Sequence, residues 1–178
     1  LGLGLGCFSR HQHNVVRNRP CRVMLLSRER IVHANAGGEH TLAVTDKGQL
    51  YAWGVNKHGQ LGVGDFTNKA LPTLVASFEQ VTTTNIASEM VYNVVPSPIP
   101  RVKQVSAGSG EHSVVLTEAG EVYTMGFEAY TAADTDDESR DGVLGHDTLG
   151  LEELNVPTLV MALVPQTEEY LKTCKVPE

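Results

Sequence analysis

Two histidines, His40 and His112, hold equivalent places in two similar segments of the sequence. A pair of imidazoles could serve acid–base catalysis or hold a metal ion. A residue that recurs with a repeated unit is more often part of the architecture. We therefore interpret both as buried imidazoles that bridge neighbouring strands through hydrogen bonds.

One group of residues near the start has the types of a zinc site. Cys7, His11, His13 and Cys21 offer thiolate and imidazole ligands, which tetrahedral zinc accepts. Their spacing fits no standard zinc finger. We interpret them as loop residues and expect no metal.

Two further segments could bind phosphate or calcium. Residues 54–59 have the glycine spacing of a phosphate-binding loop, but Gln60 stands where that loop needs lysine. The acidic segment 134–141 has Ser139 where a calcium loop needs glycine. Since no nucleophile–base set can be nominated either, we expect no cofactor and no catalytic residue, and we assign the glycines to turns.

The elements that must carry these residues are β-hairpins. Segments 36–54 and 107–126 are two copies of one pattern, which align without a gap from the histidine onward. Apolar residues alternate on both sides of three-residue connections, 46–48 and 118–120, that end in glycine. This is typical of two strands joined by a turn with a left-handed residue. Apolar residues ahead of each copy predict a short preceding strand.

The segments after each hairpin repeat as well. The pattern of 55–75 returns loosely in 142–160, and residues 1–26 resemble the tail of an earlier copy. The string Gly-Gly-Glu-His-Thr-Leu-Ala-Val-Thr, continued through Leu-Tyr-x-Trp-Gly-x-Asn-x-x-Gly-Gln-Leu-Gly-x-Gly-Asp at 37–65, resembles the repeat of the regulator of chromosome condensation family. The resemblance implies an all-β fold, the seven-bladed β-propeller, of which this chain holds two to three blades.

The residues that we assign to the repeat framework are Gly37, His40, Gly48, Trp53, Gly54, Gly62, Gly64, His112, Gly120, Gly126 and Gly145. The second copy departs from the family pattern in two places. Ser109 is an extra residue ahead of the histidine, and Met125 replaces the usual tryptophan.

We divide the chain into the tail of a partial repeat (1–29), a first full repeat (30–75), an inserted loop (76–101), a second repeat (102–160) with an acidic insertion (127–141), and a following element or extension (161–178). Long unpatterned connections on a rigid frame often carry function. The candidate partner contacts in the two insertions are Tyr92, Pro98, Asp134, Asp136, Asp137 and Glu138.

Bulk composition narrows the setting. The formal net charge is −7 and no stretch is apolar enough for a membrane helix, so we expect no membrane contact. Nucleic acid is expected, if at all, only at the arginine-rich segment 10–30. Three cysteines and no glycosylation sequon favour an intracellular compartment, nuclear or cytoplasmic and cytoskeletal. The start at Leu1 suggests an excerpt from a longer polypeptide.

Three functions are compatible with these features. The leading hypothesis is a non-enzymatic interaction scaffold that binds protein partners within a larger assembly. The resemblance implies a second, guanine-nucleotide exchange on a small GTPase of the Ran type. The third is a targeting domain of a multi-domain ubiquitin ligase or kinase.

Overall fold

The computed structural model describes residues 19–86, 89–109, 111–127, 144–146, 153–160 and Leu163. Its order of elements is a short 3-10 helix followed by ten strands: η2 (Met24–Leu26), β1 (Ile31–Ala36), β2 (His40–Thr45), β3 (Leu50–Gly54), β4 (Lys69–Leu74), β5 (Phe78–Ile86), β6 (Glu89–Ser97), β7 (Val102–Ala107), β8 (His112–Thr117), β9 (Val122–Phe127) and β10 (Glu153–Leu159). The all-β prediction is confirmed.

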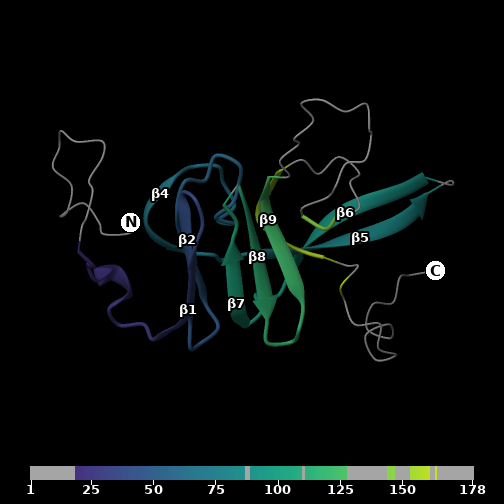
Figure 1. Ribbon diagram of the computed structural model, residues 1–178. Helices are drawn as coiled ribbons and strands as arrows, with labels where there is room; N and C mark the ends of the chain where they lie inside the picture. The colour runs from purple at the N-terminus through teal and green to yellow at the C-terminus, as the bar shows by residue number, and fades with distance from the viewer. Residues whose placement is uncertain are drawn as a thin grey trace.

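The strands form two sheets (Figure 1). Blade 1 is the antiparallel sheet β1-β2-β3-β4, and blade 2 is the sheet β7-β8-β9-β10, to which β5 and β6 are added. The two blades repeat each other closely. Both have an irregularity at the same place in the first strand pair, between Ile31 and His33 and between Val102 and Gln104.

Each predicted hairpin turn is present with the left-handed residue at its end. Gly48 has φ +77° and Gly120 has φ +86°, a region that residues with a Cβ rarely adopt. The same hydrogen bond closes both turns, from Gly48 N to Thr45 O at 3.0 Å and from Gly120 N to Thr117 O at 3.2 Å. The two copies therefore fold alike because their local turn chemistry is alike.

The main core lies between the blades. One face of β2 and β3 packs against the opposite face of β8 and β9, and the members of this cluster are Leu42, Val44, Leu50, Ala52, Leu61, Val75, Phe78, Val102, Val105, Val115, Tyr123, Met125 and Leu159. Each fully buried side chain of this size contributes about 1.5–3 kcal/mol. The other face of blade 1 is covered by Leu26 of η2, which packs with Ala43 and Trp53.

Residues 76–101 require a correction, because the expectation of an unpatterned loop is wrong there. The segment contains the hairpin β5–β6, paired in one continuous register from Phe78–Ser97 to Ile86–Glu89. Its start joins blade 2 through parallel pairing of Glu79 with Thr158. Threonine and valine favour strands. Of the three prolines at its end, Pro96 lies within β6, and Pro98 and Pro100 follow the hairpin.

Candidate functional site

The junction between the blades is built around His40. This imidazole is 3% exposed, and its Nε2 lies 2.8 Å from Oγ of Ser113 on β8. The same hydroxyl lies 2.8 Å from the carbonyl oxygen of Gln60, in the segment that follows β3. A histidine of one repeat is therefore joined to a serine of the next repeat and to the connection between them.

The hydroxyl fixes the tautomer of the imidazole. Ser113 has one proton, and the Gln60 carbonyl can only accept, so the serine donates to that carbonyl. Toward His40 the serine must accept, and Nε2 carries the proton. Nδ1 is then the unprotonated nitrogen, and it has no hydrogen-bond partner within the described part of the chain.

Burial keeps this histidine neutral. Desolvation, and after it the nearby His112, lower the pKa of His40 to about 4. An imidazole of that pKa carries no charge at neutral pH. It serves as a neutral hydrogen-bond donor across the junction.

Glycines allow the two blades to approach each other at the same end. A Cβ on Gly37 would lie 2.2 Å from the carbonyl oxygen of Gly108, and one on Gly38 would lie 2.6 Å from that of Ser109. The extra residue Ser109 does not disturb the turn, since Gly37 N and Gly108 N each bind the carbonyl of the following histidine, at 2.9 and 3.1 Å. The second turn accommodates its insertion and keeps this bond.

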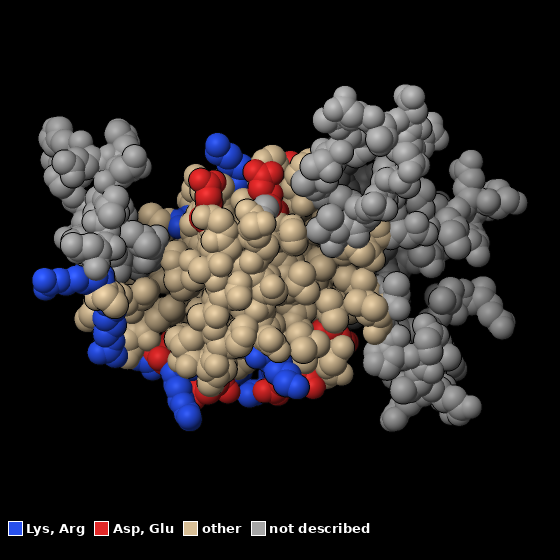
Figure 2. Space-filling model, in the orientation of Figure 1, with Lys and Arg blue, Asp and Glu red and all other residues tan. Residues whose placement is uncertain are grey.

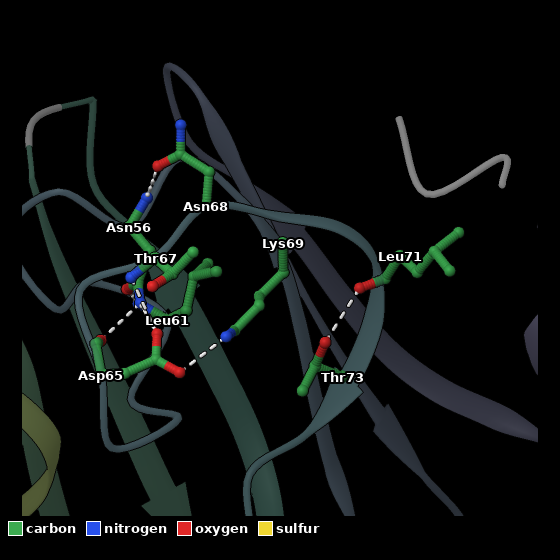
Figure 3. Close-up of polar contacts among 8 residues, drawn as sticks. All are labelled: Asn56, Leu61, Asp65, Thr67, Asn68, Lys69, Leu71 and Thr73. Carbon is green, nitrogen blue, oxygen red and sulfur yellow. Dashed lines mark hydrogen bonds and ion pairs between the residues drawn. The ribbon is translucent and has the colours of Figure 1, made fainter. Parts of the chain in front are cut away.

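The segment 55–66, which we call the connecting loop, is braced from within (Figure 3). Asn56 is fully buried, and its side chain accepts from Leu61 N at 2.9 Å and donates to Asp65 O at 2.6 Å. Asp65 in turn accepts from Thr67 N at 2.7 Å and pairs with Lys69 at 2.6 Å. The asparagine and aspartate of the repeat thus hold the shape of this loop.

The connecting loop belongs to the sequence of the first repeat but lies on blade 2. Gly64 N donates to the carbonyl of Asn155 at 2.8 Å. A Cβ on Gly62 would lie 2.2 Å from Sδ of Met125 and 3.0 Å from Pro157. The methionine that replaces tryptophan on β9 is therefore covered by the preceding repeat.

His58 holds the same loop against two carboxylates. Its Nδ1 lies 2.8 Å from a carboxylate oxygen of Glu153, and its Nε2 lies 3.2 Å from one of Glu111. The ring also packs on Phe127, with centroids 5.1 Å apart. The three side chains are between 30% and 43% exposed, so these contacts supply orientation more than energy.

Side chains of β1 occupy the backbone edge of β7. Val105 N donates to His33 Nδ1 at 3.3 Å, and Ala107 N donates to Asn35 Oδ1 at 2.9 Å. Strand β7 is the last strand of its sheet, so these bonds pair backbone groups that no strand meets. Blade 1 therefore protects the edge of blade 2.

Of the two histidines in the framework, His40 is buried and bridges the blades, whereas His112 is only partly buried, so the prediction of a buried imidazole is wrong there. Trp53 is buried in the blade 1 core, and positive φ angles occur at Gly54, Gly62, Gly64, Gly126 and Gly145. The carbonyl oxygens of Glu39 and Glu111 would lie 2.4 and 2.1 Å from a Cβ on Gly54 and Gly126. Only glycine fits at these two strand ends.

The predicted partner contacts are placed in part. Tyr92 lies on β6, and Pro98 follows that strand and is exposed. Asp134, Asp136, Asp137 and Glu138 lie outside the described residues. Of the two insertions, the described residues therefore cover only the first.

Of the four residues with the types of a zinc site, only Cys21 lies in the described part of the chain. Cys7, His11 and His13 lie outside the described residues, and Cys21 is exposed, with Sγ 3.5 Å from Arg19 O. In the ranges that are described, no group of three or more His, Cys, Asp or Glu side chains could hold a metal ion. No helix there is long and apolar enough to cross a membrane.

The sequence did not reveal the contacts of Ser113, or those of His58 with Glu111 and Glu153. No local pattern marks them, because each joins segments that are 53 to 95 residues apart. The one available signal that this loop has a structural task was that Leu61-Gly62 returns in the second copy as Leu144-Gly145. Figure 2 shows charged side chains at the ends of the strands on this side of the molecule, with uncharged surface between them.

Comparison with known proteins agrees with this geometry. The pattern of the regulator of chromosome condensation (RCC1) repeat matches residues 1–44 and 47–116, more than half of the chain. The Ultraviolet-B receptor UVR8 of Arabidopsis thaliana is 32% identical over 129 residues, 71% of this chain and 25% of the receptor. The human E3 ubiquitin-protein ligase HERC2 is 43% identical over 84 residues, 47% of this chain and 2% of the ligase.

A solved structure, that of Prp20p from Saccharomyces cerevisiae, is described together with its binding to Gsp1p and histones. It is 22% identical, with a TM-score of 0.46, over 75% of this chain and 26% of its own. The chain thus spans about a quarter or less of these relatives. Because the pattern of the repeat matches more than half of its residues, the chain belongs to the regulator of chromosome condensation (RCC1) repeat family.

Proposed function

We propose that this chain forms part of a protein-interaction propeller, a rigid frame that presents insertions to protein partners within a longer protein or assembly. The observation that carries the proposal is the hairpin β5–β6. It interrupts the repeat between two closely similar blades, and Figure 1 shows it extending beyond them. Apart from Phe78, no residue of this hairpin is among the described residues of the main core, and such a segment is available for binding.

The rigidity of the frame supports the same proposal. His40, Ser113 and the connecting loop join the two blades at several points. A partner bound to an insertion therefore meets a surface that does not have to be ordered first, which lowers the free-energy cost of association. The proposed contacts are Tyr92 and Pro98 in the first insertion and the acidic residues 134–138 in the second.

Within this proposal, the chain acts as a targeting unit of a larger protein. The observation that favours this reading is the length of the relatives, since the matched part of the human ligase HERC2 is 2% of that protein. Catalysis would then belong to other parts of the polypeptide, and this region would select what they act on. A small GTPase of the Ran type stays a predicted partner.

The test is affinity capture with the full-length parent protein from its natural source. One variant replaces residues 79–97 by a short Gly-Ser linker, and a second replaces 128–141 in the same way. We expect each variant to keep its unfolding midpoint and at least one to lose a partner that the wild type captures. Capture of the same partners by both variants would refute the assignment of function to the insertions.

A separate assay addresses the GTPase. Nucleotide release from a panel of small GTPases is measured with and without the full-length protein. Acceleration for one member supports a GTPase partner. Unchanged rates across the panel would remove this hypothesis and leave the interaction proposal intact.

A further inference from the structure

Strand β6 ends the six-stranded sheet. Its sole neighbour among the described strands is β5. Figure 1 shows the two strands extending away from the rest of blade 2. An outermost strand presents a row of backbone N–H and C=O groups that can pair with another strand. The residues that present them can be identified from the register.

Pro96 settles which groups face outward. In an antiparallel pair, residues that exchange two N–H···O bonds alternate with residues that exchange none. Pro96 lies opposite Glu79 and has no N–H, so this pair exchanges none. The register is continuous, so every second residue before Pro96 also turns its backbone groups away from β5. These residues are Val94, Tyr92 and Met90.

We propose that this edge pairs with the same edge of a second copy of the chain. Three outward residues spaced by two are symmetric about the middle one. In an antiparallel pair with a two-fold axis at Tyr92, Met90 of each copy meets Val94 of the other, and Tyr92 meets its counterpart. The three outward pairs then form about six backbone hydrogen bonds.

The residue types along β6 suit a second copy. Residues 90–97 carry no charge, and Glu89, at the start of the strand, would lie opposite Val95 and not opposite itself. Like charges therefore do not meet across the pair. Pro96 and Glu89 limit pairing at the two ends, as residues at protected edges do.

Symmetry also makes the assembly finite. A two-fold contact uses the same surface on both copies, so one pairing consumes both edges. A head-to-tail contact would leave an edge open and continue into a fibre. The inference concerns the same hairpin that carries the proposed function. Its failure would remove self-pairing only, because the binding of other proteins is tested separately by affinity capture.

The first test measures mass in solution by light scattering at about 100 µM chain. Tyr92→Pro removes one outward N–H and no bond to β5, as Pro96 already does. Tyr92→Thr is the matched control, since it keeps the N–H and favours a strand. We expect dimers for the wild type and the threonine variant and monomers for the proline variant. A monomeric wild type, or a proline variant that still dimerises, overturns the proposal.

The second test does not depend on how proline is tolerated. In a background with Cys7, Cys21 and Cys174 changed to serine, Tyr92→Cys places two thiols on the axis, with Cα atoms about 5.5 Å apart, within reach of a disulfide. Met90→Cys places them about 13 Å apart, too far to bond. Oxidation should give a covalent dimer from the first variant and none from the second. Equal yields, or no dimer from the first, would contradict the two-fold pairing.

Discussion

Replacing Ser113 by alanine should lower the free energy of unfolding by more than the loss of one hydrogen-bonded hydroxyl usually does. The side chain is fully buried, and its oxygen holds His40 Nε2 and the Gln60 carbonyl, both at 2.8 Å. Alanine leaves a buried donor and a buried acceptor without partners. Each unsatisfied group costs about 1–3 kcal/mol, so we expect a loss of about 3 kcal/mol in the free energy of unfolding.

Urea unfolding followed by tryptophan fluorescence measures this loss, because Trp53 is buried in blade 1. Thr158→Val is the matched control, since this buried hydroxyl makes a local bond to Val156 O at 3.2 Å. Its cost should stay below about 1 kcal/mol. The slope of the transition should be unchanged in both variants, which shows that the same surface unfolds.

A double-mutant cycle separates the two partners of the serine. In a His40→Leu background the serine still bonds to the Gln60 carbonyl, so Ser113→Ala should cost about half as much as in the wild type. A cost below about 1 kcal/mol in the wild type, or an equal cost in both backgrounds, would refute the argument that this hydroxyl couples the blades.

Three further predictions follow from the junction. Gly48→Ala should cost more than Gly120→Ala, since both have positive φ but only the Cβ at 48 would meet Arg101, at 2.8 Å from its Cβ; the free energies of unfolding, measured in urea, should differ by at least about 1 kcal/mol. Because the pKa of His40 is about 4 when folded and 6.5 when unfolded, stability falls as pH drops from about 6.5 to 4, by up to about 3 kcal/mol, and His40→Leu should flatten that part of the pH profile. His58→Ala should cost less than about 1 kcal/mol in the free energy of unfolding, because its contacts with Glu111 and Glu153 are partly exposed; a larger loss would show that packing on Phe127 dominates.

Local features of the fold could be predicted from the sequence, whereas contacts between repeats could not. The three-residue connection 46–48, which ends in glycine, predicts a left-handed conformation at that glycine, and Gly48 has this conformation. The partner of His40 lies 73 residues away. No pattern in the sequence around His40 or Ser113 predicts that they meet. Their hydrogen bond depends on how the two blades pack against each other.

The hairpin β5–β6 shows why the insertion was misjudged. Its strand-forming threonines and valines stood next to prolines, which are normally excluded from sheets. Pro96 is compatible with a strand because its missing N–H lies on the side away from β5. A proline in a segment rich in valine thus indicates which edge is outermost as readily as it indicates a loop.

The position of the connecting loop has a consequence for how such repeats evolve. Residues 55–66 are inherited with the first repeat but complete the packing of the second. A recombination event that joins sequences at the repeat boundary would separate this loop from the surface it was selected to fit. The unit that can be duplicated or exchanged without loss therefore runs from the middle of one repeat to the middle of the next. Variation at Met125 should accordingly track variation in the loop of the preceding repeat more closely than variation in its own.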